Sequence, residues 1–251
     1  MKNTRLKKIE SFLKEKETST VQELCEVFNV SVNTIRRDIA ELTEKGTVNK
    51  FYGGVSYNKT KYSTYENRST QNKSIKDRIS ELAAKNIKED EIIYIDSGTT
   101  TANILTHLDS NIRLTVITNS LDIITHASKM PNVELYIIGY KYRSISRSFI
   151  GTLDNNKVLN FNINKAFMSV SGISISEGLT NSDYSETEIK HSICNIANEI
   201  FVLADSTKIN KSALLTYCDL EGIDAIFTDK NSDTNFNNFC EKHNIKILIC
   251  D

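Results

Sequence analysis

The stretch at residues 31–39 constrains the fold of this chain more than any other. It places two adjacent arginines and three small polar residues at the start of an amphipathic helix, and a shorter helix precedes it across a tight turn at residues 28–30. This is the layout of a helix-turn-helix, whose second helix presents its N-terminal residues to base edges in the major groove of DNA. The residues expected to contact DNA here are Ser31, Asn33, Thr34, Arg36 and Arg37.

Apolar residues at helical spacing predict three helices in this module. Their buried sides are expected from Leu6, Ile9, Phe12 and Leu13, then from Leu24, Val27 and Phe28, and finally from Ile35, Ile39 and Leu42. Thr20 is the expected N-cap of the second helix, with Glu23 as its capping-box partner. Ser31 is the expected cap of the third helix, which ends at Gly46.

Two short strands, residues 47–50 and 55–57, flank Phe51-Tyr52-Gly53-Gly54 and predict the wing of a winged helix. The paired glycines serve a turn in any case. Lys50 and Tyr52 on this wing, with Gly53 at the turn, complete the expected DNA contacts, to the backbone or the minor groove.

Charge is unevenly distributed between the two ends of the chain. Residues 1–73 hold 14 Lys and Arg against 9 Asp and Glu, whereas the remaining residues hold 17 against 23. A basic head on an acidic body indicates a DNA contact confined to one end. Chance unevenness is the alternative explanation.

Cysteine and histidine usage argues against disulfides and metal sites. The five cysteines form no CxxC pair, and the four histidines are scattered without zinc-ligand spacing. Reduced, mostly buried thiols are typical of a cytoplasmic protein. No apolar h-region follows the basic N-terminus, and no apolar run approaches the roughly 18 residues of a membrane span.

From about residue 74, short apolar runs bounded by turns alternate with helical stretches. The expected strands are residues 92–95, 114–117, 133–138, 166–170, 200–203, 225–227 and 245–249. This alternation predicts an α/β domain with a mainly parallel sheet, which binds ligands at the carboxyl ends of its strands. The expected organisation is a winged helix-turn-helix at 1–57, a polar linker at 58–73, and an α/β effector-binding and oligomerisation domain at 74–251.

Polar turns follow several of these strands. Asp96-Ser97-Gly98-Thr99-Thr100-Thr101 leads into a helix expected near Ala102, and this arrangement is typical of a small phosphate cradle. It lacks the lysine of a nucleotide P-loop and the glycines of a dinucleotide loop, so no cofactor is expected. A well-capped turn is the alternative. Thr118-Asn119-Ser120 and Ser171-Gly172-Ile173 repeat the theme.

Two charged pairs are further candidates. Glu186 and Lys190 are four residues apart on a helix, where a surface ion pair is the simplest expectation. Asp205 and Lys208 follow another strand, where they would bind sugar hydroxyls and phosphate or be solvated.

Taken together, these motifs resemble the DeoR-type bacterial regulators of sugar metabolism along nearly the whole chain. The matching pieces are TIRRD at 34–38, Gly53-Gly54, DSGTTT at 96–101, TNS at 118–120, YR at 142–143, SFIG at 148–151, SGI at 171–173, EGLT at 177–180, Glu186, Lys190 and ADSTK at 204–208. The resemblance implies a winged helix joined to a sugar-phosphate-binding domain with a fold like that of ribose-5-phosphate isomerase.

The expected effector pocket combines the resemblance with the polar turns. It is lined by Asp96, Ser97, Gly98, Thr99, Thr100, Thr101, Asn119, Tyr142, Ser171, Gly172, Glu186, Lys190, Asp205 and Lys208. The chain departs from the family pattern at Ile138-Gly139-Tyr140, where paired glycines are common, at Met168-Ser169, where Ile-Gly is usual, and at Asn162, where Asp is frequent.

These observations predict a cytoplasmic transcriptional repressor of a sugar-utilisation operon, controlled by a phosphorylated sugar. The expected partners are double-stranded operator DNA and further copies of the chain in a dimer or tetramer, with no membrane and no catalytic or metal site. The alternative is a sugar-phosphate isomerase-like enzyme, since Glu186, Lys190 and Asp205 are residue types that acid–base chemistry uses. The sequence does not separate a repressor from an activator.

Overall fold

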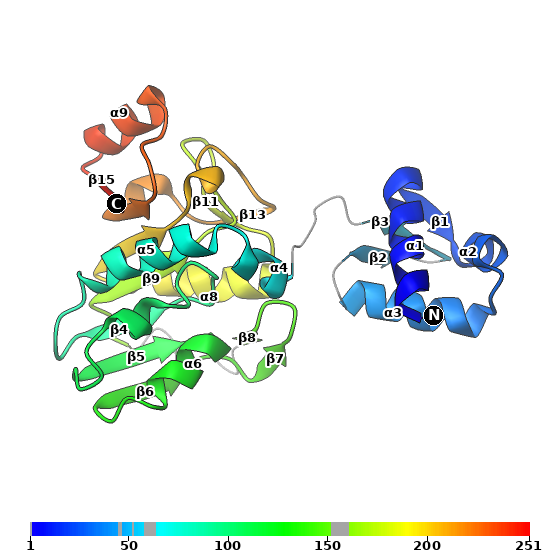
Figure 1. Cartoon of the computed structure of the whole chain (residues 1–251). Coiled ribbons are helices and arrows are strands. Elements are labelled where there is room, and N and C mark those ends of the chain that lie inside the picture. Colours follow the sequence, from blue (N-terminus) through cyan, green and yellow to red (C-terminus); the bar gives the residue numbers. More distant parts are fainter. Residues whose placement is uncertain (1, 45–46, 52, 58–63, 152–160) are drawn as a thin grey trace. The chain divides into compact units, whose positions relative to one another are not determined.

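The computed structural model describes residues 2–44, 47–51, 53–57, 64–151 and 161–251 (Figure 1). The chain forms two compact units, Met1–Arg68 and Ser69–Asp251. The polar stretch 58–73, expected as a linker, contains helix α4 (Tyr65–Thr70), and α5 (Lys73–Ala84) begins at its end. Thr64 Oγ1 accepts the Asn67 N–H at 3.3 Å, a local capping bond that an apolar pattern does not reveal.

The N-terminal unit has the expected three helices and wing. The helices are α1 (Lys2–Lys16), α2 (Val21–Phe28) and α3 (Val32–Glu44). Its sheet consists of β1 (Thr18–Thr20), β2 (Val48–Phe51) and β3 (Gly54–Tyr57), antiparallel in the order β1-β3-β2. The fold-class prediction is confirmed, while β1, only three residues long, escaped the sequence pattern.

The core of this unit follows the predicted helical spacing with one error. The fully buried residues from the predicted set are Leu6, Ile9, Leu13, Leu24, Ile35, Ile39 and Leu42. The prediction that Val27 is buried is wrong, because its side chain is 50% exposed. On the short helix α2, Val21, Leu24, Cys25 and Phe28 share the packed side, and Val27 lies outside that stripe.

The predicted N-caps of α2 and α3 are confirmed, because each capping hydroxyl accepts a backbone N–H of its helix. Thr20 Oγ1 accepts the Glu23 N–H at 3.1 Å, and Ser31 Oγ accepts the Thr34 N–H at 3.3 Å. The reciprocal half of the capping box is wrong, since the Glu23 carboxylate accepts instead from Lys16 and, at 2.8 Å, from Ser19 Oγ. The Lys16 ammonium is the main reason that the pKa of Glu23 is lowered. Gly46 lies outside the described residues.

All seven predicted strands form one parallel sheet in the C-terminal unit. They are β4 (Ile92–Ile95), β5 (Leu114–Thr118), β6 (Val133–Ile137), β9 (Lys165–Ser169), β12 (Glu199–Leu203), β14 (Ala225–Thr228) and β15 (Lys246–Ile249). Their order is β15-β14-β12-β9-β4-β5-β6. Every neighbouring pair is parallel, so all carboxyl ends meet at one edge.

Packed layers cover both faces of this sheet. One face carries α5, the 3-10 helix η1 (Ile104–His107) and α6 (Leu121–Ala127). The other carries α8 (Tyr184–Cys194), α9 (Thr234–Lys242) and an antiparallel sheet of β10 (Gly172–Ser174), β11 (Gly178–Asn181) and β13 (Leu215–Cys218). Alternation within β9 shows the division, because Ala166 and Met168 pack on one side and Phe167 on the other.

A hairpin and two 3-10 helices are the remaining short elements in the described part of the C-terminal unit. The hairpin of β7 (Lys141–Arg143) and β8 (Ser148–Ile150) follows β6. The 3-10 helices η2 (Ser206–Lys208) and η3 (Leu220–Gly222) follow β12 and β13.

Candidate effector and DNA-binding sites

The polar turns after four strands lie at the same edge of the parallel sheet, as predicted. Asp96 follows β4, Asn119 follows β5, Ser171 follows β9 and Asp205 follows β12. Because β9, β4 and β5 are neighbours, the first three come close together, whereas Asp205 lies one strand further along.

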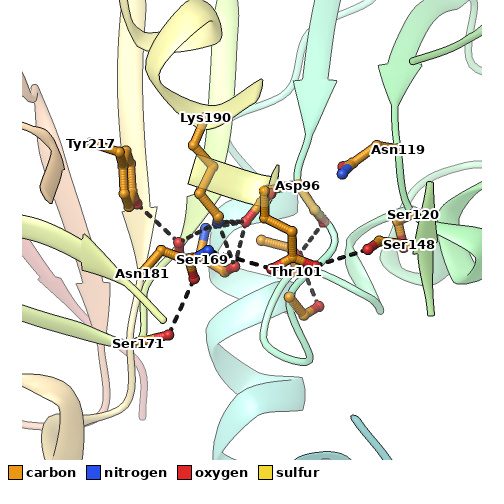
Figure 2. A network of polar contacts seen from close by, with 12 residues as sticks. Asp96, Thr101, Asn119, Ser120, Ser148, Ser169, Ser171, Asn181, Lys190 and Tyr217 are labelled. Atoms are coloured by element: carbon orange, nitrogen blue, oxygen red, sulfur yellow. Dashed lines mark hydrogen bonds and ion pairs between the residues drawn. The ribbon is translucent and has the colours of Figure 1, made fainter. Parts of the chain in front are cut away.

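A buried ion pair lies at the centre of this edge. The Lys190 ammonium reaches from α8 and donates to Asp96 Oδ2, to Ser169 O at 2.8 Å and to Ser169 Oγ at 3.3 Å (Figure 2). It also lies 5.2 Å from the ring centroid of Tyr217. The expected surface pair with Glu186 is therefore wrong, because the side of α8 that carries Lys190 packs onto the sheet.

Ser169 joins the ends of two adjacent strands through Asp96. Asp96 Oδ2 accepts both the Ser169 N–H, at 3.0 Å, and the Ser169 hydroxyl. The Tyr217 hydroxyl donates to Ser169 O at 2.9 Å (Figure 2). Burial raises the pKa of Tyr217 well above its ordinary value, so this phenol remains a hydrogen-bond donor. Neither Ser169 nor Tyr217 was predicted as a site residue, and the departure at Ser169 was the only sequence signal.

Asn119 is held by internal hydrogen bonds. Its Oδ1 accepts from the Tyr94 hydroxyl at 3.0 Å, and its Nδ2 donates to Phe149 O at 3.2 Å. Desolvation by burial raises the pKa of Tyr94 well above its ordinary value. Asn119 thus fixes the position of the β7–β8 hairpin at the carboxyl edge, since the Phe149 N–H also donates to its carbonyl at 2.7 Å.

Glu186 connects α8 to the same hairpin. Its Oε1 accepts from Ser148 Oγ at 2.8 Å, and its Oε2 accepts from Asn181 Nδ2 at 3.4 Å. Ser171 Oγ in turn donates to Asn181 Oδ1 at 3.2 Å. Glu186 and Ser171 are half-buried, so both keep part of their surface accessible.

Two arginines of the hairpin region add ion pairs to its neighbouring helices. Arg143 pairs with Asp183, the N-cap of α8. Arg147 pairs with Asp122 in the first turn of α6 at 2.7 Å. The hairpin is therefore tied to α6 and α8, on both sides of the carboxyl edge.

The loop after β4 does not enter an α-helix near Ala102, which corrects the prediction. It runs through turns to the four-residue 3-10 helix η1. Thr101 Oγ1 lies 2.6 Å from Asp96 O and 2.9 Å from Gly98 O, and such local bonds compete with helical ones.

This loop presents a row of donor groups. Among the described residues, the backbone N–H groups of residues 97–101 find no acceptor at normal hydrogen-bond geometry, and neither do the Ser97, Thr99 and Thr100 hydroxyls. Ser97 and Thr100 are only 5% and 7% exposed. The turn after β12 differs, since the Ser206 N–H donates to Asp229 Oδ1 at 2.6 Å. Consecutive backbone amides in a turn can bind an anion.

Both glycines of the expected effector pocket have a packing role. A Cβ added to Gly98 would lie 2.1 Å from Ser169 Cβ, and one added to Gly172 would lie 2.5 Å from Lys211 O. The absence of a side chain at Gly98 thus lets the loop approach Ser169, which is hydrogen-bonded to Asp96.

The remaining predicted pocket residues lie outside this hydrogen-bonded network. Asp205 is buried and caps η2 by accepting the Thr207 N–H at 3.1 Å. Lys208 is half-buried, and no partner for its ammonium occurs among the described residues. Tyr142 is exposed and packs on Phe149 with ring centroids 5.5 Å apart.

In the N-terminal unit, the exposed side of α3 carries Asn33, Arg36 and Arg37, and within the described chain none of these side chains has a hydrogen-bond or ion-pair partner. On the opposite side, Asp38 is buried and accepts from Arg5 Nε at 2.6 Å, which anchors α3 to α1. Lys50 is exposed.

At the wing turn, Gly53 has a φ of +84°, a conformation that favours glycine. Tyr52, the other predicted wing contact, lies outside the described residues.

No group of three His, Cys, Asp or Glu side chains in the described ranges is arranged to hold a metal ion. No described helix is long and apolar enough to cross a membrane.

Comparison with known families identifies both units. A model of the DeoR-like helix-turn-helix domain matches residues 5–61, and a model of the DeoR C terminal sensor domain matches residues 71–230. The chain belongs to the DeoR family.

Relatives with curated names support the same assignment for the whole DeoR-type chain. The HTH-type transcriptional regulator IolR of Bacillus subtilis (strain 168) is 45% identical over 99% of this chain and 100% of its own. The L-fucose operon activator of Haemophilus influenzae is 30% identical, covering 92% and 93%. The glycerol-3-phosphate regulon repressor of Escherichia coli (strain K12) is 26% identical, covering 92% of each chain.

Among solved structures, ribose 5-phosphate isomerase A from Methanocaldococcus jannaschii is similar with a TM-score of 0.40 and 20% identity, covering 55% of each chain. The named relatives are transcriptional regulators rather than enzymes. This DeoR-family chain is therefore a helix-turn-helix transcriptional regulator, which confirms the prediction and favours it over the isomerase-like alternative.

Proposed function

We propose that the protein is a repressor of a sugar-utilisation operon that loses operator affinity when a phosphorylated sugar binds at the carboxyl edge of the parallel sheet. The observation that carries this proposal is the row of amide donors at residues 97–101, with the Ser97, Thr99 and Thr100 hydroxyls, for which the described residues provide no acceptor. A phosphate group carries negative charge and several acceptor oxygens, so it can accept hydrogen bonds from several donors of this loop at once.

The sugar part of the effector is proposed to lie beside the phosphate. Glu186 and Ser171 are half-buried, and their oxygens suit hydroxyl groups of a sugar. Lys208 is proposed to add positive charge from the loop after β12, the strand next to β9. Asp96, Asn119 and Lys190 are proposed to shape the pocket rather than to contact the ligand, because their side chains are buried and already hydrogen-bonded.

For the switch, the effector must bind more tightly to the conformation with poor operator affinity, since equal binding shifts nothing. A typical coupling weakens DNA binding by roughly 5–150-fold, and DNA weakens effector binding by the same factor. Glycerol-3-phosphate appears in the name of one relative, which supports a phosphorylated compound as the effector class.

A thermal-shift screen tests the effector class. Sugar phosphates are compared with the parent sugars and with inorganic phosphate, because a ligand that binds only the folded state raises the unfolding temperature. We expect at least one sugar phosphate to stabilise the protein more than its parent sugar at equal concentration. Equal effects of phosphorylated and free sugars would contradict the phosphate contact.

In vitro transcription from the bound promoter tests the sign of regulation. Repression that a sugar phosphate relieves is the expected result, in line with the named repressor among the relatives. The relative named as an activator makes stimulation the specific alternative. Adding the protein distinguishes these alternatives, because a repressor lowers the transcript yield and an activator raises it.

The working form is proposed to be a cytoplasmic homo-oligomer, a dimer or tetramer. One winged helix covers few base pairs, and two-fold assemblies match palindromic half-sites. Light scattering at micromolar concentration, with and without operator DNA, distinguishes this assembly from a monomer.

A further inference from the structure

The hydroxyl groups at the start of α3 are occupied within the protein. Ser31 Oγ lies 2.9 Å from Thr34 Oγ1 and accepts the Thr34 N–H at 3.3 Å. Both hydroxyls therefore serve the helix cap. Of the polar residues expected to read bases in this turn, Asn33 alone keeps a side chain without a partner among the described residues.

Val32 occupies the position between Ser31 and Asn33 and is the first residue of α3. Its side chain is 44% exposed, although it belongs to an apolar residue type. Residues four apart are neighbours on a helix surface, so Val32 lies beside Arg36 on the exposed side. The core side of α3 is formed instead by Ile35 and Ile39.

We propose that Val32 packs against the 5-methyl group of a thymine in each operator half-site and sets a preference for thymine at that position. The inference rests on the proposed function, because it requires α3 to lie in the major groove. Thymine is the base that presents a methyl group there, and apolar side chains contact that group. Arg36, on the next turn of the same side, lies within reach of the neighbouring base pair or phosphate.

The experiment uses the full-length protein and a duplex recovered from a random-sequence library by repeated selection with that protein. Each thymine of the selected duplex is replaced in turn by deoxyuridine, which lacks only the 5-methyl group. We expect one thymine in each half-site at which the replacement weakens wild-type binding about fourfold, the effect of burying one methyl group.

Three variants assign this sensitivity to Val32. Val32→Ala should bind the selected duplex more weakly and no longer distinguish thymine from uracil at that position. Val32→Thr keeps one methyl group in the same shape and should stay sensitive. Val27→Ala is the matched control, since Val27 is similarly exposed but lies on α2, and it should retain the full uracil effect.

The outcomes separate this inference from the DNA-binding proposal. A selected duplex with no uracil-sensitive thymine, or one whose sensitivity persists in Val32→Ala, overturns the role of Val32 and leaves operator binding intact. Failure of the selection to enrich any sequence overturns sequence-specific binding by α3, and the Val32 contact with it.

Discussion

Asp96, at the carboxyl end of β4, and Lys190, on α8, form an ion pair in which the side chains are only 1% and 3% exposed. The pair links β4, an interior strand of the sheet, to the helix that covers the sheet, and Ser169 bridges both partners. Ion pairs with so little solvent are costly to break because the remaining charge has no compensation. The relationship therefore makes Lys190 a structural residue of the effector domain.

Replacing Lys190 with Met should lower the free energy of unfolding by about 3–5 kcal/mol, since it leaves the Asp96 carboxylate buried and unpaired. The double variant Lys190→Met with Asp96→Asn should recover part of the loss. Urea unfolding followed by circular dichroism measures both. The matched control is Lys85→Met, which removes an exposed pair with Glu81 and should leave the midpoint nearly unchanged.

Thr100 and Thr101 are adjacent in the loop at residues 97–101, but replacing each with valine should affect different properties of the protein. The Thr100 hydroxyl has no partner in the described chain, so Thr100→Val should keep the stability and weaken the response to the effector. The Thr101 hydroxyl bonds Asp96 O and Gly98 O, so Thr101→Val should lower the stability by about 1–3 kcal/mol. Thermal melts with and without sugar phosphate compare them, and an unchanged response in Thr100→Val would count against the donor loop.

The sequence predicted the seven parallel strands and the helix-turn-helix because both depend on local apolar periodicity. Residues such as Ile93 and Ile35 are buried where that periodicity puts them. The prediction that the polar turns lie at one edge of the sheet is also confirmed. Parallel strands place their carboxyl ends at the same edge, and this does not depend on the conformation of the loops.

What the sequence did not predict depends on contacts between distant residues. The spacing of Glu186 and Lys190 showed that they are neighbours on a helix, but not that Lys190 faces Asp96, 94 positions away. Ser169 had no motif to mark it, and its role follows from the close approach of Gly98. The loop after β4 resisted prediction because the Thr101 hydroxyl replaces helical bonds with local ones.

Cys218 should be the most reactive of the cysteines in the C-terminal unit. A hydrogen bond from Cys194 lowers the pKa of Cys218 and raises that of Cys194, while burial raises the pKa of Cys240 to about 11. A lowered pKa means more thiolate at neutral pH, and the thiolate is the nucleophile. Iodoacetamide labelling at pH 7, read by mass spectrometry, should therefore modify Cys218 first.

The Cys194→Ala variant tests the cause of this reactivity. Loss of the Cys194 thiol removes the donor to the Cys218 sulfur, so labelling of Cys218 at pH 7 should slow and its pH profile should move upward. Labelling of Cys240 as fast as Cys218 in the wild type, or an unchanged rate in the variant, would show that the two thiols do not interact in solution.

Arg36 and Arg37 should dominate the binding of DNA by the N-terminal unit. Both are exposed on α3 without a partner in the described chain, whereas Asp38 beside them is committed to Arg5. Loss of a bidentate guanine contact should weaken operator binding by about 10- to 100-fold and relax specificity at one base pair. Loss of a phosphate contact should instead weaken binding to operator and random duplex alike and reduce the salt dependence of binding.

Titrating Arg36→Ala and Arg37→Ala against both duplexes at two salt concentrations assigns each arginine to one role. Arg113→Ala, which removes an exposed arginine of the C-terminal unit, is the control for net charge, and affinities equal to that control in both variants would remove α3 as the DNA-reading helix.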